Sequence, residues 1–161
     1  MDDWNALVRD HREAIFGIAW RVLGHAQDAE DVVQDVFAQA SRQSDGRPIV
    51  SWPALLRRMA TCRAIDTLRR RRNAIPLDCV DLTAAEDDPQ AIVAGHELEA
   101  RLRAALAEIP PRDAEVFCLR YFEELSYREI AETLGMSTSA VSTALHQARS
   151  RLENMLTEPE E

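Results

Sequence analysis

The chain has 161 residues, of which 46% are hydrophobic and 29% charged, as in soluble globular proteins with one ordinary domain or two small ones. Its formal net charge of -9 argues at first against a nucleic-acid partner. No apolar run approaches the roughly 20 residues that span a bilayer, and the N-terminus lacks a signal-peptide pattern, so we expect a cytoplasmic protein without membrane insertion.

Three helical patterns fill the first 73 residues, which we expect to form the first domain of an all-α protein. Apolar residues recur at helical spacing over 4–23, and Gly24 follows as a helix stop. The second helix is expected to run from Asp28, its N-cap, to about Ser41. A third helix is predicted over 51–72, because a serine followed by a proline two residues later marks its start.

The second predicted helix has one distinctly polar face. Asp31, Gln34 and Asp35 stand at positions i, i+3 and i+4, so they share that face and point away from the apolar stripe. Two carboxylates and an amide can bind a partner through charge-assisted hydrogen bonds. The spacing alone favours the simpler interpretation, which is a solvated acidic surface.

The third predicted helix is rich in arginine. Seven arginines and one acid, Asp66, fall between Arg57 and Arg72. Such a stripe can hold phosphates, and guanidinium planes can stack on unpaired bases. The alternative for residues 69–72 is an exposed helix end, where the helix dipole favours cations. Trp52 offers a stacking ring, although a tryptophan at a helix start belongs more often to the core.

Helical periodicity fades over residues 74–96, where acidic residues accumulate. Residues 74–111 carry two arginines against eight acids. This composition predicts a flexible acidic linker over 74–96 and a second domain over 97–161. The first helix of that domain is stopped by two consecutive prolines, and a further helix follows over 113–123. The residues expected on the inner face of the first helix are Leu98, Leu102, Ala105, Leu106 and Ile109.

The last segment consists of a short helix, a glycine turn and a longer helix. Ser126 and Glu129 form a capping box, Gly135 closes the short helix, and Ser137 caps the long one. The residues of the short helix that are expected to face the core are Tyr127, Ile130, Ala131 and Leu134. The residues of the long helix that are expected to point away from the core are Ser139, Ser142, Thr143, His146 and Gln147. This is the layout of a helix-turn-helix, whose second helix enters the major groove, although any αα-hairpin gives similar spacing.

The three cysteines, Cys62, Cys79 and Cys118, form no CxxC pair and no ligand cluster with the four histidines. We therefore expect free structural thiols and neither a metal nor a cofactor. The sequence has no Walker loop, GxSxG or HExxH pattern, so we expect no catalytic residues and no enzyme.

Three collinear segments carry a family resemblance. They are Asp28-Ala-Glu-Asp-Val-Val-Gln-Asp-Val-Phe37, then Ala64-Ile-Asp-Thr-Leu-Arg-Arg70, and then Ile109-Pro-Pro-Arg-Asp-Ala-Glu-Val-Phe-Cys-Leu-Arg-Tyr-Phe122 with Leu125-Ser-Tyr-Arg-Glu-Ile-Ala131. Together they resemble an extracytoplasmic-function sigma factor of bacterial RNA polymerase. The resemblance implies that residues 1–73 bind core polymerase and open the −10 promoter element, and that 97–161 read the −35 element. The linker would thread towards the polymerase active site, as a mimic of nucleic-acid charge or as a solvated spacer.

The same resemblance assigns roles to individual residues. Asp31, Gln34 and Asp35 would bind the clamp helices of the polymerase. The residues implied at the −10 element are Trp52, Arg57, Arg58, Arg63, Arg69 and Arg70, with the loop 43–50 near a flipped base. The residues implied at the −35 element are Ser137, Ser139, Ser142, Thr143, His146, Gln147 and Arg149, with Arg151 as a further backbone contact. The resemblance also allows an anti-sigma factor as an additional partner.

The chain also departs from the family pattern. Cys62 replaces a usual asparagine, and the positions where basic residues are usual hold Ser142, Ala144, Gln147 and Ser150. Residues 112–161 carry five arginines against ten acids, so the −35 contact is expected to be weak or assisted. Two alternatives therefore stay open, namely a sigma-like decoy that binds an anti-sigma factor and a stand-alone helix-turn-helix regulator.

Overall fold

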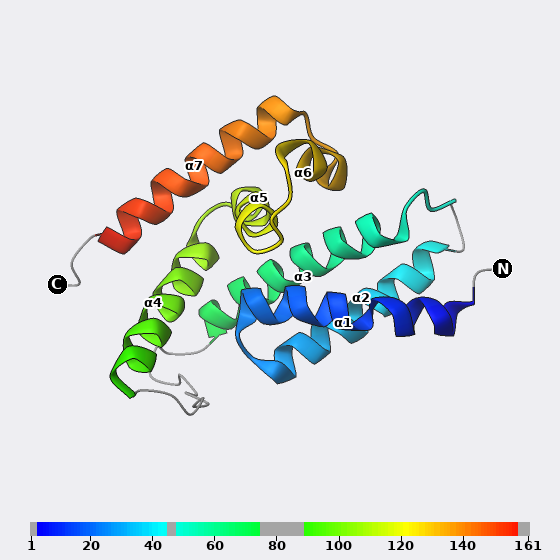
Figure 1. Cartoon of the computed structure of the whole chain (residues 1–161), viewed down its shortest axis with the longest axis horizontal. Coiled ribbons are helices and arrows are strands. Elements are labelled where there is room, and N and C mark those ends of the chain that lie inside the picture. The colour runs from blue at the N-terminus through cyan, green and yellow to red at the C-terminus, as the bar shows by residue number, and fades with distance from the viewer. Residues whose placement is uncertain (1–2, 45–47, 75–88, 158–161) are drawn as a thin grey trace.

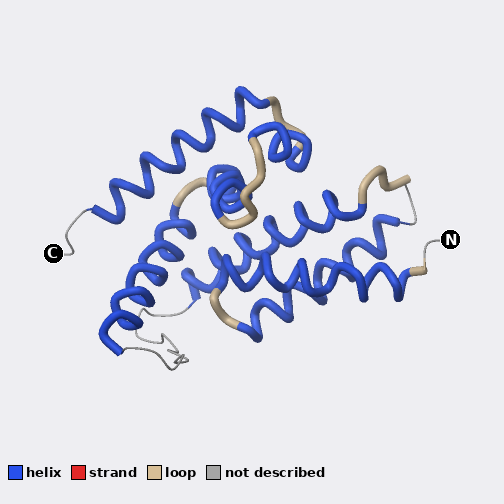
Figure 2. Tube along the Cα trace, viewed as in Figure 1, coloured by secondary structure: helices blue, strands red, loops and turns tan. Residues whose placement is uncertain are grey.

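The computed structural model of the chain describes residues 3–44, 48–74 and 89–157. These residues form seven α-helices and no strand, which confirms the predicted all-α fold (Figure 2). In chain order the helices are α1 (Trp4–Leu23), α2 (Ala26–Ser44), α3 (Trp52–Ala74), α4 (Pro89–Glu108), α5 (Pro111–Tyr121), α6 (Tyr127–Leu134) and α7 (Thr138–Thr157).

Helices α1, α2 and α3 form the N-terminal unit, in which each helix contacts the other two. Their apolar stripes meet in a core that includes Ile15, Val22, Val33, Val36 and Ile65, each no more than 1% exposed. Burying side chains of this size contributes about 1.5–3 kcal/mol each, so this core holds the three helices in a fixed arrangement.

Local signals explain where these helices begin and end. Gly24 adopts φ +63°, and its N–H donates to the carbonyl of Trp20 at 2.7 Å, as the predicted helix stop requires. The prediction of Asp28 as the N-cap of the second helix is wrong, because α2 already begins at Ala26. The ring Nδ1 of His25 accepts the N–H of Asp28 at 3.3 Å and takes the capping role instead.

Helix α3 begins as predicted and passes through the middle of the molecule. The hydroxyl of Ser51 accepts the N–H of Ala54 at 3.4 Å, which caps the helix start. The buried residues of this helix include Leu56, Met59, Ala60, Ala64, Ile65 and Leu68. Buried residues on more than one side mean that α3 packs against helices on more than one side.

Helices α4 to α7 form the C-terminal unit. Helix α4 begins at Pro89, so part of the expected linker is helical, while residues 75–88 and Cys79 lie outside the described residues. The helix ends at Glu108, before the two prolines, as predicted. Leu98, expected on the inner face, is 56% exposed, and this prediction is wrong. The inward positions of α4 start instead at Leu102, which is half-buried against the core as predicted, and continue with the buried Ala105 and Leu106. Helix α4 contacts α3 and α7.

The predicted helix-turn-helix is present as α6, a turn and α7. Ser126 and Glu129 form the predicted capping box, and Gly135 ends α6 with φ +68°. The hydroxyl of Ser137 accepts the N–H of Ala140 at 3.0 Å at the start of α7. Tyr127 is not inward as expected but 39% exposed, and the guanidinium of Arg120 lies over its ring, 5.3 Å from the ring centroid.

Replacing Ser126 with alanine should destabilise the helix-turn-helix. The variant loses the oxygen that accepts the N–H of Glu129 at 3.1 Å, so we expect a loss of about 1 kcal/mol in the free energy of unfolding. Urea denaturation followed by circular dichroism would measure it. Ser139→Ala, on the exposed face of α7, is the control and should leave the midpoint unchanged; equal midpoints for both variants would contradict the capping role.

The two units share one hydrophobic core. Leu106 and Ile109 from the junction of α4 and α5, and Ala114 and Cys118 from α5, belong to the same buried cluster as the residues of α1 to α3. A second cluster is confined to the helix-turn-helix and α5. Figure 1 shows the resulting order, with α3 and α5 between the α1–α2 pair and α7. The C-terminal unit is thus packed directly on α3.

Candidate functional site

The polar face predicted on α2 is open to solvent. Asp31, Gln34 and Asp35 are all exposed, while Val33 and Val36 on the opposite side are buried. Asp35 lies 3.5 Å from the guanidinium of Arg63, and the other two side chains make no contact with the C-terminal unit among the described residues. Two carboxylates and an amide are therefore presented together on a rigid helix, available to a partner.

The predicted arginine stripe of α3 divides into free and engaged side chains. Arg70 is exposed and has no hydrogen bond or ion pair with any described residue. Arg63 sits between two carboxylates, 3.5 Å from Asp35 and 3.9 Å from Asp66. Arg69 Nη1 donates to the carbonyl of Ile109 at 2.7 Å and is thereby held by the C-terminal unit. Only part of the stripe is available to a ligand in this arrangement.

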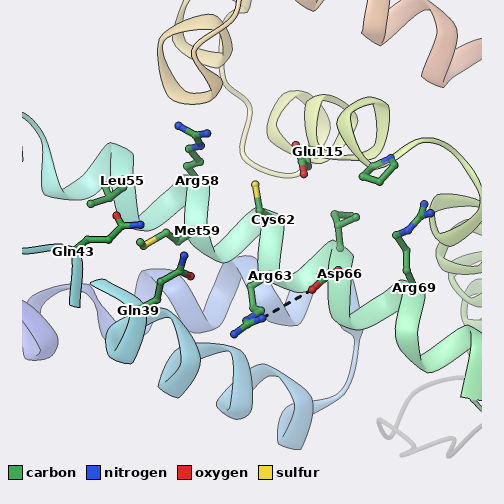
Figure 3. A pocket seen from close by; sticks show the side chains of 12 residues that line it. Gln39, Gln43, Leu55, Arg58, Met59, Cys62, Arg63, Asp66, Arg69 and Glu115 are labelled. Carbon is green, nitrogen blue, oxygen red and sulfur yellow. Dashed lines mark ion pairs between the residues drawn. The ribbon is translucent and has the colours of Figure 1, made fainter. Parts of the chain in front are cut away.

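A polar groove of about 510 Å³ runs along α3, between α2 and α5. Figure 3 shows Gln39 and Gln43 reaching in from α2, and Glu115 pointing down from α5 towards Cys62. Arg58, Arg63 and Arg69 line the same groove from α3. The groove therefore collects three of the predicted DNA-binding arginines, and one of its walls belongs to the C-terminal unit.

Glu115 and Cys62 form a hydrogen-bonded pair across this groove. Burial raises the pKa of the Cys62 thiol to about 12, with a further contribution from the nearby Glu115 carboxylate. Burial also raises the pKa of Glu115, against the opposing effects of the Cys62 bond and of Arg112 and Arg58. Cys62 stays a thiol at neutral pH and acts as a hydrogen-bond partner.

Glu115→Gln should make the chain more stable relative to the wild type as the pH rises. The raised pKa of Glu115 means that the folded chain keeps this proton to higher pH than the unfolded chain, whose pKa is near the ordinary 4.5. Wild-type stability therefore falls over that window, whereas the neutral amide does not titrate.

Urea denaturation at several values from about pH 4 to about pH 8 measures the difference between variant and wild type. The difference should be smallest at the acidic end. Glu132→Gln, on the exposed side of α6, is the control and should show no such trend. A Glu115→Gln difference that is constant with pH would contradict the burial of this carboxyl group.

The ring of Trp52 packs at the start of α3 against the N-terminal core. Its centroid lies 6.0 Å from that of Trp4 in an edge-on contact, and the side chain is half-buried. This packing agrees with the interpretation of Trp52 as a residue of the hydrophobic core. The loop expected near a flipped base, 43–50, is only partly described, because residues 45–47 lie outside the described residues.

The predicted recognition face of α7 points to solvent. Its exposed residues are Ser139, Ser142, Thr143, His146, Gln147 and Arg149. Ala144 is buried with Val141, so one position where the family usually has a basic residue faces the core here. Arg151, expected to reach the DNA backbone, instead donates to Asp113 of α5 at 3.1 Å. Arg149 is the one arginine of α7 without a partner among the described residues.

Sequence reasoning missed the residues that join the two units. Arg21 of α1 donates through Nε and Nη2 to the carboxylate of Glu123, in three hydrogen bonds of 2.7–2.9 Å, across 102 positions of sequence. Arg72 of α3 pairs with Glu108, and Arg103 Nε donates to the carbonyl of Val22 at 3.2 Å. No periodicity or motif links residues so far apart in the chain, so only the folded structure reveals these contacts.

No group of three or more His, Cys, Asp or Glu side chains within the described residues is arranged to hold a metal ion. None of the described helices combines the length and apolar character that crossing a bilayer requires.

Comparison with known proteins matches both units to one family. Residues 7–74 match the family model for sigma-70 region 2, and residues 99–152 match that for sigma-70 region 4. These ranges coincide with α1–α3 and with most of α4–α7. The helices carrying the exposed carboxylates and the arginine stripe therefore lie in region 2, and the helix-turn-helix lies in region 4.

Curated relatives extend the match over almost the whole chain. The chain is 32% identical over 160 residues to the ECF RNA polymerase sigma factor SigE of Mycolicibacterium smegmatis, a match that spans 97% of this chain and 62% of SigE. It is 30% identical over 168 residues to the RNA polymerase sigma factor YlaC of Bacillus subtilis, spanning 99% and 95% of the two chains.

A solved structure shares the fold. The sigma factor RpoE of Bartonella quintana, crystallised in complex with the anti-sigma factor NepR, superimposes with a TM-score of 0.59 over 99% of this chain and 100% of RpoE, at 19% identity. Two matched regions, collinear relatives and a shared helical fold agree: the chain belongs to the extracytoplasmic-function sigma factors of bacterial RNA polymerase.

Proposed function

We propose that the chain binds core RNA polymerase in the cytoplasm and directs it to specific promoters, without catalysis of its own. The observation that carries this proposal is the joint presence of two surfaces in the matched regions. One is the exposed carboxylate face of α2, and the other is the arginine-rich helix α3 beside it. A factor that recruits a polymerase and opens DNA needs both.

In this proposal the face of Asp31, Gln34 and Asp35 binds the arginine-rich clamp helices of the polymerase. Charge-assisted hydrogen bonds are shorter and about twice as strong as neutral ones, which suits a contact made by exposed side chains. Helix α3 then receives the opened −10 strand. Its arginines neutralise phosphates and stack on bases that have lost their partners.

The face of α7 reads the −35 element in this scheme. Ser142, Thr143 and Gln147 supply donors and acceptors for base edges, and Arg149 supplies one cation for the backbone. With one free arginine on this helix, phosphate neutralisation adds little, so the −35 contact is weak on its own. Attachment to the polymerase compensates, because it holds α7 near the DNA.

Co-elution tests the proposal. The purified chain is mixed with core polymerase and passed over a size-exclusion column, and it should move with the polymerase at micromolar concentrations. Elution of the two proteins in separate peaks would overturn the proposal.

A sigma-like decoy is the second candidate, favoured by the single free arginine of α7. A decoy would capture a small anti-sigma protein from a lysate and would leave the polymerase subunits behind. Affinity purification of the tagged chain, followed by mass spectrometry, distinguishes the two functions.

A further inference from the structure

One residue of α3 does not suit a helix that binds DNA. Asp66 is the single acid among the seven arginines between Arg57 and Arg72. Its side chain is 60% exposed, and the phosphates of a nucleic acid repel a carboxylate in that position. The acid weakens any contact that its neighbours make with DNA, so DNA binding gives no reason for its presence.

Asp66 is joined to the polar face of α2 through Arg63. Arg63 Nη1 lies 3.9 Å from Asp66 Oδ2, and Arg63 Nε lies 3.5 Å from Asp35 Oδ2. One guanidinium therefore pairs with a carboxylate of each helix. Figure 3 shows Arg63 pointing down from α3 towards α2, whereas Arg58 and Arg69 point up towards the C-terminal unit. Asp66 thus belongs to the side of α3 on which Asp35 lies.

Within this group the acids are more accessible than the arginine. The Arg63 side chain is 33% exposed, and its Nε is buried without a hydrogen bond. The carboxylates of Asp35 and Asp66 are 52% and 60% exposed. Their distances to Arg63 exceed those of ordinary N–H···O hydrogen bonds, so both carboxylates keep lone pairs for another donor. The group therefore presents its acids to a partner.

These contacts create one acidic surface on two helices. Asp31, Gln34 and Asp35 lie on α2, and Asp66 continues the surface on α3. Three carboxylates stand there against the one guanidinium of Arg63. Such an excess attracts a basic partner and repels nucleic acid. The arginine-rich clamp helices of the polymerase are a partner of this chemistry.

We propose that the polymerase-binding surface extends from α2 onto α3, and that Asp66 is a further contact to the clamp helices. The inference rests on the proposed function, which puts the clamp on the α2 face. Arg63 lies between Asp35 and Asp66 and reduces the repulsion between them, so both acids can stand on one surface. Arg63 then belongs to the polymerase-binding surface, and DNA is bound by other arginines of α3, such as the exposed Arg70.

The variant Asp66→Asn tests the contact, because it removes the charge and keeps the shape of the side chain. We expect the full chain to bind immobilised core polymerase about tenfold more weakly, as we also expect for Asp35→Asn. Asp10→Asn is the matched control on α1, because its side chain is 63% exposed and lies 3.7 Å from an arginine. The control should bind like the wild type. An affinity of Asp66→Asn equal to that of the control overturns the proposal.

A second comparison separates a direct contact from an effect through Arg63. Without the charge of Asp66, Arg63 is free to pair more closely with Asp35, which would withdraw Asp35 from the polymerase. In a chain that carries Arg63→Gln this route is closed. A direct contact predicts that Arg63→Gln/Asp66→Asn binds about tenfold more weakly than Arg63→Gln. Equal affinities of these two chains overturn the proposal.

Run-off transcription separates polymerase binding from a role at the DNA. With core polymerase at a fixed concentration, Asp66→Asn should need about tenfold more of the chain to reach half of its maximal yield. The maximal yield should be at least that of the wild type, which also shows that the variant is folded. A yield that stays below the wild-type maximum at every concentration would place Asp66 in promoter opening and overturn the proposal.

Failure of the proposed function gives a different pattern of results. If the wild-type chain does not bind core polymerase, the proposed function and this inference fail together. If the wild type binds and Asp35→Asn weakens binding, while Asp66→Asn binds like the wild type, only the extension onto α3 fails.

Discussion

A chain carrying alanine at Asp31, Gln34 and Asp35 is expected to bind core RNA polymerase at least about 100-fold more weakly than the wild type. The three side chains share one exposed face of α2, and each loses a hydrogen bond to a charged partner. Such bonds contribute about 1.5–3 kcal/mol each. Losing all three should therefore weaken binding by at least the factor given above. Surface plasmon resonance with immobilised core polymerase measures the affinity.

The control for this variant is Asn5→Ala/Asp10→Ala/Glu13→Ala. It removes the same chemical groups, two carboxylates and one amide, from other exposed positions, all of them on α1. It should bind polymerase with an affinity close to that of the wild type. Equal losses for both triple variants would mean that general charge, rather than the α2 face, determines binding. A stand-alone helix-turn-helix regulator would not bind the immobilised polymerase, either as wild type or as one of the two variants.

Arg69→Ala/Arg70→Ala should impair promoter opening far more than recruitment of the polymerase. Each arginine that contacts the opened strand is worth about 1–3 kcal/mol, so we expect at least about tenfold less open complex. Permanganate footprinting of unpaired thymines measures opening, and a filter-binding assay on the same promoter measures recruitment. Unchanged permanganate reactivity would contradict the role of α3.

The two single variants should differ, because the structure places these neighbours in different surroundings. Arg70 is exposed and unpaired among the described residues, so Arg70→Ala loses only a DNA contact. Arg69 donates to the carbonyl of Ile109, so it is less available to the opened strand than Arg70. The defect in opening should therefore be larger for Arg70→Ala. The reverse order would contradict the view that the Ile109 contact limits the part Arg69 plays at the DNA.

Local signals in the sequence predicted most of the helix ends. Gly24 and Gly135 both adopt the left-handed conformation that ends a helix, and Ser126 and Glu129 form the expected capping box. These features depend on residues within a few positions of each other, where the backbone geometry leaves few choices. The exposed faces of α2 and α7 followed in the same way from helical spacing.

The errors arose where tertiary contacts or a neighbouring side chain replaced the local signal. His25 caps α2 in place of Asp28, because the Gly24 turn brings its ring to the free N–H groups. Tyr127 is covered by Arg120 on the outside rather than packed inside. Leu98 lies on a turn of α4 that precedes the buried positions Ala105 and Leu106.

The packing of the two units could not be predicted from the sequence. It depends on Arg21 with Glu123 and on Arg69 with the carbonyl of Ile109, pairs separated by 102 and 40 positions. Each of these side chains is equally compatible with a solvated surface when only the sequence is known. The fold and the two helices that we propose to face DNA were therefore predictable, whereas the packing of the two units against each other was not.

The central claim is that this chain gives core polymerase its choice of promoter, and in vitro transcription tests it most directly. Core polymerase is incubated with a library of promoter fragments, with and without the purified chain, and the run-off transcripts are sequenced. Our account predicts transcripts that start at a small set of related promoters and appear only when the chain is present. An active core enzyme that yields the same transcripts with and without the chain would contradict it.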